Sequence, residues 1–341
     1  MRGRLLYLRW LALVALVLVA SILGIGAQIT TEPIVMLPGD PPQGIYVATV
    51  NGLCVSEDWG QTFTRYDPGN SNVTAVYVDG TDWYIGTWNG LCISNETSGV
   101  RTFQLLAPDP NDDETLHIRD VVVDDGTIYA ATLGGLCISS DGGATFTTLT
   151  ASHELGTTRT YDVRVGNGML FVGTHGGLSI SDDGGATIVT YTKADGLAAD
   201  EVNGLHYDTD RDILYVATRP GGLSIAYDVS CTFPNLAFVN RAAIGSGMNS
   251  AIAVAAQGSR IVVGTYSSLN ISRDCGATFT YPSLGLTSAA AVLGVAVHDR
   301  HIYAATEGGL RFSNDNGVSF DVLTTDCGLD SCTCRFVFLV R

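Results

Sequence analysis

Charge is scarce in this chain, and lysine is nearly absent. Charged residues make up only 15% of the 341 positions, and Lys193 is the one lysine. So few charges exclude a disordered tail protein and a charged coiled coil, because both are built largely from charged residues. Acidic residues outnumber basic ones 34 to 18, which gives a formal net charge of −16. A surface this negative repels phosphate backbones, so general nucleic-acid binding is excluded.

Glycine is abundant but follows no collagen pattern. The 40 glycines have no Gly-X-Y period, and this number of them indicates many tight turns. Apolar residues make up 46% of the chain, which is typical of a globular protein. The composition therefore predicts a turn-rich, acidic β protein.

The amino-terminal residues have the pattern of a targeting segment. Arg2, Arg4 and Arg9 stand before an apolar run over residues 10–25. Basic residues followed by such a run indicate a signal peptide or an uncleaved signal anchor. We therefore expect a targeting segment at 1–28, a proline-rich linker at 29–44 and an exported domain at 45–341. The domain would be periplasmic or extracellular, and an uncleaved segment would be its only membrane contact.

Eight cysteines in an exported chain raise the question of disulfides. Cys54, Cys92 and Cys137 fall at the same place in three successive repeats, where neighbouring sheets are too far apart for a bridge, so we expect small buried hydrophobic residues. A pair among Cys327, Cys332 and Cys334 could join the carboxy terminus. The sequence leaves the pairing of these three, and of Cys231 and Cys275, open. The spacing predicts no zinc site.

One segment recurs seven times along the chain. The first copy reads IYVATVNGLCVS from position 45, and the third reads IYAATLGGLCIS from position 128. Each copy contains one threonine at the same place: Thr49, Thr87, Thr132, Thr174, Thr218, Thr265 and Thr306. Their spacing of about 40 to 45 residues is the period of a four-stranded propeller blade.

The ends of the repeat predict how the ring closes. A β-rich run precedes every copy except the first: 73–78, 118–123, 161–165, 202–207, 251–256 and 291–297. The missing run stands after the seventh copy, at 335–340. Pairing it with 45–49 would remove the exposed sheet edges. We therefore predict an all-β fold, a seven-bladed β-propeller with four antiparallel strands per blade, closed by the carboxy-terminal strand.

A second motif, Ser-x-Asp-x-Gly-x-Thr-Phe, stands between the third and fourth predicted strands. A carboxylate at this place can accept backbone N–H bonds inside its own turn, and the glycine supplies a positive φ. We therefore interpret the motif aspartates as structural: Asp58, Asp141, Asp183, Asp274 and Asp315. The second copy lacks the aspartate, and the fifth has Ala226 in place of the serine.

This motif resembles the Asp-box (BNR) repeat of sialidases, xyloglucanases, sortilin-type receptors and photosystem II assembly factors. The resemblance extends over nearly all of residues 45–341. It is similar in particular to the single lumenal propeller of photosystem II stability and assembly factors. It implies an exported propeller that serves either as a binding platform or as a glycoside hydrolase.

One column inside the repeat varies while its neighbours are repeated. It lies at the turn between the second and third strands and is occupied by Val50, Trp88, Leu133, His175, Arg219, Tyr266 and Glu307. Varied side chains on a repeated frame are how a scaffold hosts a binding site. We therefore predict a binding ring made by Trp88, His175, Arg219, Tyr266 and Glu307. The alternative is that turn positions drift without function.

Two groups of possible metal ligands remain. An acidic cluster runs from Asp109 to Glu114, but it lacks the loop pattern and glycine of a calcium site, so we expect solvated acidity. His298 and His301 flank a hairpin turn that we expect to be solvated. The sequence therefore predicts no metal and no cofactor.

The absence of catalytic signatures favours a non-catalytic protein. Sialidases, which the motif resembles, carry an Arg-Ile-Pro segment that this chain lacks, and xyloglucanases use a cleft between two propellers. No Gly-x-Ser-x-Gly or His-Glu-x-x-His occurs. We predict an exported interaction or assembly platform with a protein partner at the membrane or cell surface. The alternative is a glycoside hydrolase or carbohydrate-binding propeller of the Asp-box class.

Overall fold

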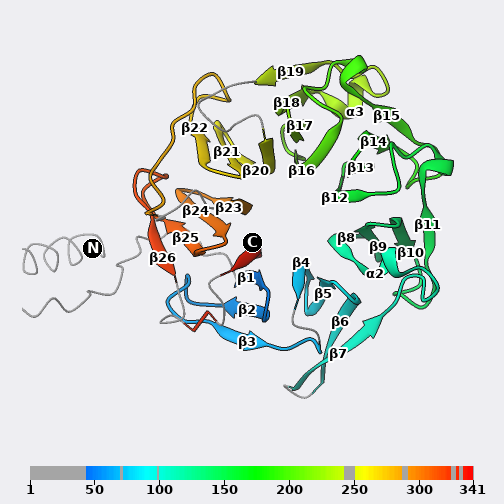
Figure 1. Cartoon of the computed structure of the whole chain (residues 1–341), viewed down its shortest axis with the longest axis horizontal. Helices are drawn as coiled ribbons and strands as arrows, with labels where there is room; N and C mark the ends of the chain where they lie inside the picture. The colour runs from blue at the N-terminus through cyan, green and yellow to red at the C-terminus, as the bar shows by residue number, and fades with distance from the viewer. Residues whose placement is uncertain are drawn as a thin grey trace, which may run out of the picture. The chain divides into compact units, whose positions relative to one another are not determined.

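Seven small antiparallel sheets stand around one axis in the computed structural model, which makes a seven-bladed β-propeller (Figure 1). The structure describes residues 44–69, 72–97, 100–241, 250–285, 291–323, 328–329 and 333–340. Contacts divide the chain into Met1–Asp40 and Pro41–Arg341, and every described residue belongs to the second unit. The predicted targeting segment at 1–28 lies outside the described residues, as do Cys327 and Cys332. No helix in the described ranges is long and apolar enough to cross a membrane.

The blades are numbered from the amino-terminal end, and the strands of each blade are named in order from the axis outward. Blade 1 contains β27 Cys334–Val340, β1 Gly44–Thr49, β2 Gly52–Ser56 and β3 Thr64–Tyr66. Blade 2 contains β4 Val73–Asp79, β5 Asp82–Thr87, β6 Gly90–Thr97 and β7 Val100–Leu106. Blade 3 contains β8 Ile118–Asp124, β9 Thr127–Thr132, β10 Gly135–Ser139 and β11 Thr147–Leu149. Blade 4 contains β12 Thr160–Gly166, β13 Met169–Thr174, β14 Gly177–Ser181 and β15 Val189–Tyr191.

The remaining blades follow the same order with one exception. Blade 5 contains β16 Glu201–Asp208, β17 Ile213–Arg219, β18 Gly222–Tyr227 and β19 Phe238–Arg241. Blade 6 contains only β20 Ala251–Gln257, β21 Arg260–Thr265 and β22 Leu269–Ser272. Blade 7 contains β23 Val292–His298, β24 His301–Thr306, β25 Gly309–Ser313 and β26 Asp321–Leu323. In blade 6 the segment around Thr280 stands in the place of the fourth strand and pairs with β22 through a single antiparallel bridge to Ile271, so this outer edge is shorter than in the other blades over the described residues.

The carboxy-terminal strand closes the ring as predicted. β27 pairs antiparallel with β1, so that Phe338 lies opposite Tyr46 and Val337 opposite Val47 (Figure 1). The first blade thus takes its innermost strand from the far end of the chain. Closure removes the open sheet edge that an all-β protein would otherwise expose.

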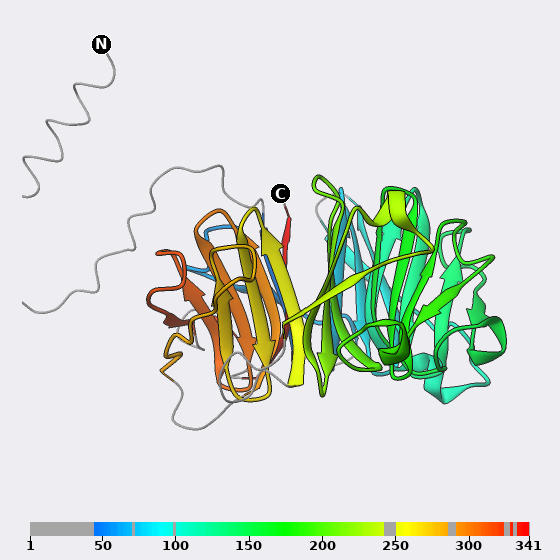
Figure 2. The same cartoon turned by 90° about the horizontal axis from the view of Figure 1, so that it is seen from above.

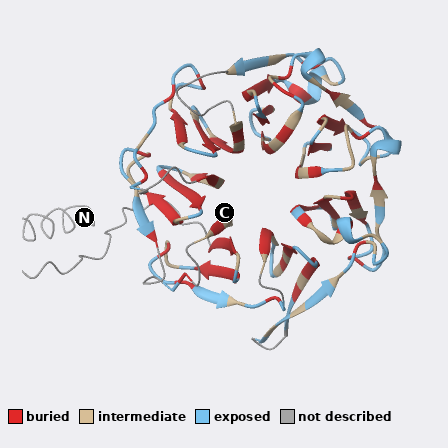
Figure 3. Ribbon diagram, in the orientation of Figure 1, coloured by how far each residue is buried: buried red, intermediate tan, exposed pale blue. Residues whose placement is uncertain are grey.

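Each blade is buried between its two neighbours. All residues of β1 and β2 are buried, because a sheet covered on both faces needs apolar side chains on both (Figure 3). Tyr46 and Trp83, for example, lie edge to face at 5.2 Å between blades 1 and 2. The outermost strands, such as β7, are largely exposed (Figure 3). Cys54, Cys92 and Cys137 are all buried, as predicted.

The two rims of the ring carry different connections. Seen edge-on, the strands run between the two rims (Figure 2). On one rim the Ser-x-Asp turns contact the turns between first and second strands. In blade 7, for example, the N–H of Asn316 in the Ser-x-Asp turn donates to the carbonyl of Arg300 in the other turn over 3.0 Å. On the other rim Trp88 contacts His117, which brings the turn between second and third strands beside the connection that enters the next blade.

One expectation about a hairpin turn is wrong. His301 is only 3% exposed rather than solvated. Its ring lies 4.6 Å from that of Trp59 and stacks on Phe312 at 5.8 Å. Trp59, in the Ser-x-Asp turn of blade 1, covers the His301 ring, whereas Asp299 and Arg300 at the tip of the hairpin are exposed.

Candidate functional site

A threonine holds the turn between the second and third strands of each blade. In blade 1 the buried Thr49 hydroxyl donates to the carbonyl of Gly52 over 2.9 Å and accepts the N–H of Asn51 over 3.2 Å. The same two bonds recur at Thr87, Thr132, Thr174 and Thr306. They fix the backbone and leave the residue after the threonine at the tip of the turn. The threonine is therefore repeated, whereas the tip residue is free to vary.

The tip residues form what we call the outer ring: Val50, Trp88, Leu133, His175, Arg219, Tyr266 and Glu307. Trp88 is 43% exposed and Tyr266 46%, which is unusual for aromatic side chains of this size. His175, Arg219 and Glu307 are also exposed, while Val50 and Leu133 are half-buried. The five predicted site residues thus all reach solvent on this rim.

A second ring lies nearer the axis, at a β-bulge in the innermost strand of every blade. In each blade the pairing with the next strand skips one residue near the start of the inner strand. A bulge leaves its extra residue unpaired and turns it out of the ladder. These residues, the inner ring, are Thr74, Arg119, Tyr161, Asn203, Ile252, Leu293 and Arg335, and all of them line an axial cavity of about 530 Å³.

Side chains of both rings join in a row across blades 4 to 6. The Tyr161 hydroxyl lies 3.4 Å from Nδ1 of His175. That Nδ1 is 3.9 Å from one Glu201 oxygen, and the other Glu201 oxygen is 3.5 Å from the Arg219 guanidinium. Arg219 lies over the Tyr266 ring at 5.1 Å. Burial raises the pKa of Tyr161, and the nearby Glu201 charge adds to that shift.

We call the rim that carries the outer ring, where the axial cavity opens, the mouth. Two further guanidinium groups lie there, across blades 1 to 4. Arg335 lies over the Trp88 ring at 5.0 Å, and Arg119 lies over the Tyr161 ring at 5.7 Å. Burial lowers the pKa of Arg335, and the positive charge of Arg119 lowers it further. Within the described ranges, no carboxylate lies within 4.0 Å of the guanidinium nitrogens of Arg119 or Arg335. The mouth is therefore locally cationic on a strongly acidic protein.

The predicted ring residues do not all meet. His175, Arg219 and Tyr266 lie in one row, whereas Trp88 belongs to the second group with Arg335. Glu307 lines the same cavity and forms no ion pair with either group in the described ranges. The structure thus divides the predicted ring into two clusters and one separate carboxylate.

Sequence reasoning missed Glu201 and the whole inner ring. A signal for the inner ring exists, since the second residue of each inner-strand run varies while the first and fourth residues stay small or apolar: VTAV, IRDV, TYDV, VNGL, AIAV, VLGV and CRFV. Glu201 opens β16 directly opposite Arg219. That contact depends on strand register, which the sequence does not display.

Five turns on the opposite rim use their aspartates internally. In blade 3 the Ser139 hydroxyl donates to Asp141 over 2.8 Å and accepts the N–H of Gly143 over 2.8 Å. Asp141 accepts the hydroxyl of Thr145 at 2.6 Å and its N–H at 2.9 Å. Equivalent bonds occur at Asp58, Asp183, Asp274 and Asp315. The Thr145 bonds, and then that of Ser139, lower the pKa of Asp141 to about 2.

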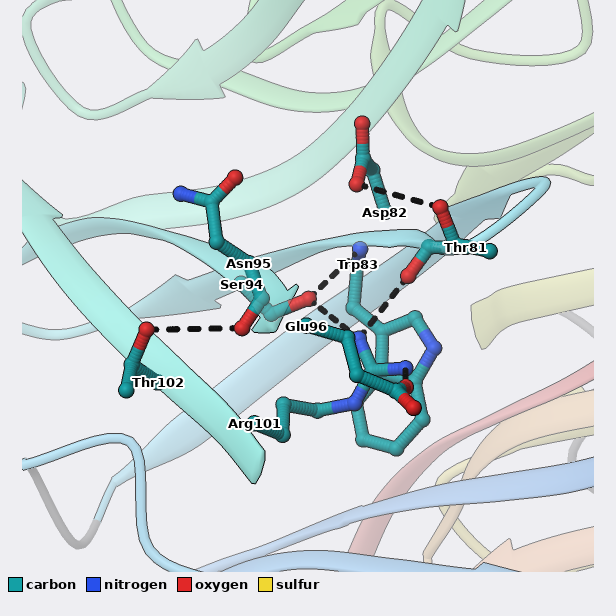
Figure 4. A network of polar contacts seen from close by, with 8 residues as sticks. All are labelled: Thr81, Asp82, Trp83, Ser94, Asn95, Glu96, Arg101 and Thr102. Carbon is teal, nitrogen blue, oxygen red and sulfur yellow. Dashed lines mark hydrogen bonds and ion pairs between the residues drawn. The ribbon is translucent and has the colours of Figure 1, made fainter. Parts of the chain in front are cut away.

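Blade 2 lacks this aspartate and uses an arginine instead (Figure 4). The Ser94 hydroxyl accepts the N–H of Trp83 over 2.9 Å and an N–H of Arg101 over 2.7 Å. Arg101 also donates to Glu96 over 2.6 Å and lies 3.7 Å from the centre of the Trp83 ring. The guanidinium thus joins the third and fourth strands of this blade where a carboxylate joins them elsewhere.

The acidic cluster forms a short capped helix rather than an open loop. Helix α2 spans Asp113–Leu116, and Asp112 caps it by accepting the N–H of Glu114 over 3.0 Å. Asp109 accepts the N–H of Asn111 over 2.9 Å. Two of these carboxylates therefore have local structural roles. No group of three or more histidine, cysteine or acidic residues able to hold a metal occurs in the described part of the chain.

Comparison with known proteins identifies the fold. No protein-family model and no curated protein matches this chain. The extracellular domain of a candidate one-component system from B. thetaiotaomicron superposes with a TM-score of 0.62 at 16% identity, over 78% of this chain and 35% of that one. This chain therefore spans about a third of that domain.

Two other solved structures have the same fold. YCF48 from Cyanidioschyzon merolae has a TM-score of 0.55 at 15% identity, over 73% of this chain and 84% of that one, and a YCF48 structure holds a D1 peptide. An ancestral GH74 enzyme has a TM-score of 0.50 at 14% identity, over 84% of this chain and 53% of that one. At such identities the likeness concerns the fold alone.

Proposed function

We propose that this protein is a non-catalytic, exported propeller that binds a partner protein at the mouth of its channel. The observation that carries the proposal is the convergence of two exposed aromatic side chains, Trp88 and Tyr266, with the guanidinium groups of Arg335 and Arg219 on one rim. These are the residue types that dominate binding energy at protein interfaces. They stand on a rigid frame, which limits the entropy lost on binding.

The charge of the mouth indicates the kind of partner. The whole chain carries a formal charge of −16, yet Arg119, Arg219 and Arg335 gather at this rim. Complementary charge speeds association and excludes wrong partners. The partner segment is accordingly acidic, with an apolar or aromatic group that packs on Trp88 or Tyr266.

Three further points support this proposal. YCF48, a propeller of the same fold, is known with a D1 peptide bound. The extracellular domain from B. thetaiotaomicron agrees with an exported location, in which the amino-terminal segment is a signal peptide or an anchor. The Ser-x-Asp turns, which we assign to the Asp-box class, hold their aspartates ionised in structural bonds, and a permanently ionised carboxylate is a poor general acid at neutral pH.

The test is a peptide-display selection against the folded chain. We expect enriched peptides to be acidic and to lose about 2 kcal/mol of binding, roughly 30-fold, for each of Trp88→Ala and Tyr266→Ala. Tyr281→Ala and Val318→Ala are the matched controls, because these side chains are 46% and 75% exposed outside the mouth. Equal binding to all variants would refute the proposal. The glycosidase alternative predicts hydrolysis of a sialoside or β-glucan panel that Glu307→Gln abolishes.

A further inference from the structure

Two buried aspartates lie directly behind the inner ring. Asp120 on β8 follows Arg119, and Asp162 on β12 follows Tyr161; they are 3% and 8% exposed. Other blades place small or apolar residues after the bulge: Ala75, Gly204, Ala253, Gly294 and Phe336. The fold therefore does not require a carboxylate here. Burying two of them side by side is costly unless their charge is compensated.

Both carboxylates cross to the next blade and share one guanidinium. Oδ2 of Asp120 accepts the N–H of Val163 over 3.1 Å, and Oδ2 of Asp162 accepts the N–H of Leu205 over 3.2 Å. Nη1 of Arg164 contacts Asp120 and lies 3.1 Å from Oδ1 of Asp162. One guanidinium thus serves two carboxylates, so the fully ionised cluster would carry a net charge of −1 in a buried place.

One oxygen of each carboxylate has no hydrogen bond. Among the described residues, Oδ1 of Asp120 is buried without a hydrogen-bond partner, and Oδ1 of Asp162 accepts no hydrogen bond although it lies 3.1 Å from Nη1 of Arg164. Leaving a buried polar atom without a hydrogen bond destabilises the folded state, because the atom loses its bonds to water and gains none in return. Nη1 of Arg164 contacts both side chains, which places the two carboxylates side by side at one guanidinium. A single proton between them would satisfy both oxygens and make the cluster electrically neutral.

We propose that Asp120 and Asp162 share one proton in the folded protein at neutral pH. Like charges at one site cannot both ionise easily, so one member of such a pair keeps its proton. In support, burial raises the pKa of Asp162 well above its usual value, with Arg164 opposing the shift and Asp120 adding to it. This inference does not depend on the proposed function.

The surrounding groups define how the pair responds to pH. The strands packed beside it contribute these charged or titratable side chains to the same cavity: Tyr77 from β4, Arg119 from β8, Tyr161 and Arg164 from β12, and His206 from β16. Strands β9 and β13 contribute none. Because folding raises the pKa of Asp162, protonation of this carboxyl group favours the folded state. That stabilisation is complete below the pKa of the group in the unfolded chain, and it is lost as the pH rises through the pKa of the group in the folded protein. A second ionisation would place two anions beside the Arg119 and Tyr161 contact at the mouth.

The test is difference infrared spectroscopy of the full chain, which detects the carbonyl stretch of a protonated carboxylic acid. We expect this band at pH 7 and its loss in both Asp162→Asn and Asp120→Asn. Asp183→Asn is the control and leaves the band unchanged, because Asp183 has a pKa of about 2 and is ionised.

Three results would overturn the proposal: no band in the wild type at pH 7, a band unaffected by either substitution, or a band lost only in Asp162→Asn. In the last case the proton would belong to Asp162 alone. If neither variant folds, a pH titration of the wild-type protein provides the test. Its carbonyl band must then vanish as the pH is raised while circular dichroism still shows folded protein, and a band that persists would overturn the proposal.

Discussion

The two rims of this propeller use one repeated backbone in opposite ways. On the rim of the Ser-x-Asp turns the same side-chain bonds recur, as Ser139 and Asp141 show for blade 3. At the mouth the repeated threonine bonds fix only the backbone, and each blade presents a different side chain. A residue whose side chain holds its own turn is constrained by the fold. At the mouth the preceding threonine fixes the backbone of the tip residue, so the side chain of that residue is available for binding. For this reason we propose that the binding site lies at the mouth.

The largest expected effect concerns the frame that both rims share. Val337 on β27 is 3% exposed and lies opposite Val47 across the closing pair. Val337→Asp would bury an unpaired charge there, and we expect it to cost about 4 kcal/mol or more. Thermal unfolding followed by circular dichroism measures the loss. Val318→Asp, at a position that is 75% exposed, is the control. A similar melting temperature for both variants would show that the closing strand is dispensable.

Acid should weaken the Ser-x-Asp rim in all five turns at once. The pKa of Asp141, Asp183, Asp274 and Asp315 is lowered to about 2, and that of Asp58 is lowered too. Between pH 4 and pH 2 the unfolded chain therefore binds more protons than the folded one, and stability falls as the pH falls. Melting temperatures measured from pH 5 to pH 2 should show this decline. Asp141→Asn should flatten it, and an unchanged slope would contradict the role given to these bonds.

Removing one turn serine tests a single unit of the same rim. Ser139 is 1% exposed, and its hydroxyl is the hydrogen-bond acceptor of the Gly143 N–H. Ser139→Ala leaves that N–H unsatisfied and should cost about 1–3 kcal/mol of unfolding free energy. Urea unfolding measures this loss, with Ser152→Ala, at an exposed position of the short 3-10 helix Ala151–His153, as the control. Binding of the selected peptides should not change, and a loss of binding without a loss of stability would connect the two rims.

The sequence predicted the blades because their bonds repeat. The threonine column recurs in all seven blades and the serine column in six, and the pairing of 335–340 with 45–49 followed from the missing first strand. It predicted the outer ring because that column adjoins the repeated threonine. It did not predict Arg101 in blade 2, since this arginine reaches Ser94 from the fourth strand. Neither did it predict Glu201, whose contacts to His175 and Arg219 depend on strand register and on a neighbouring blade.

The smallest expected change in stability is at the mouth itself. Glu201→Gln removes the negative charge between His175 and Arg219, which are mostly exposed, so the free energy of unfolding should change by no more than about 0.5 kcal/mol. The pKa of Tyr161 should fall, because the Glu201 charge helps to raise it. Binding of acidic peptides should tighten, because Arg219 loses its counter-charge. Titration of ring-labelled tyrosines by NMR and peptide affinity measure the two effects, with Glu114→Gln on helix α2 as the control. Weaker binding in Glu201→Gln would mean that this carboxylate contacts the ligand, and the mouth would then have to be described as a mixed-charge site rather than a cationic one.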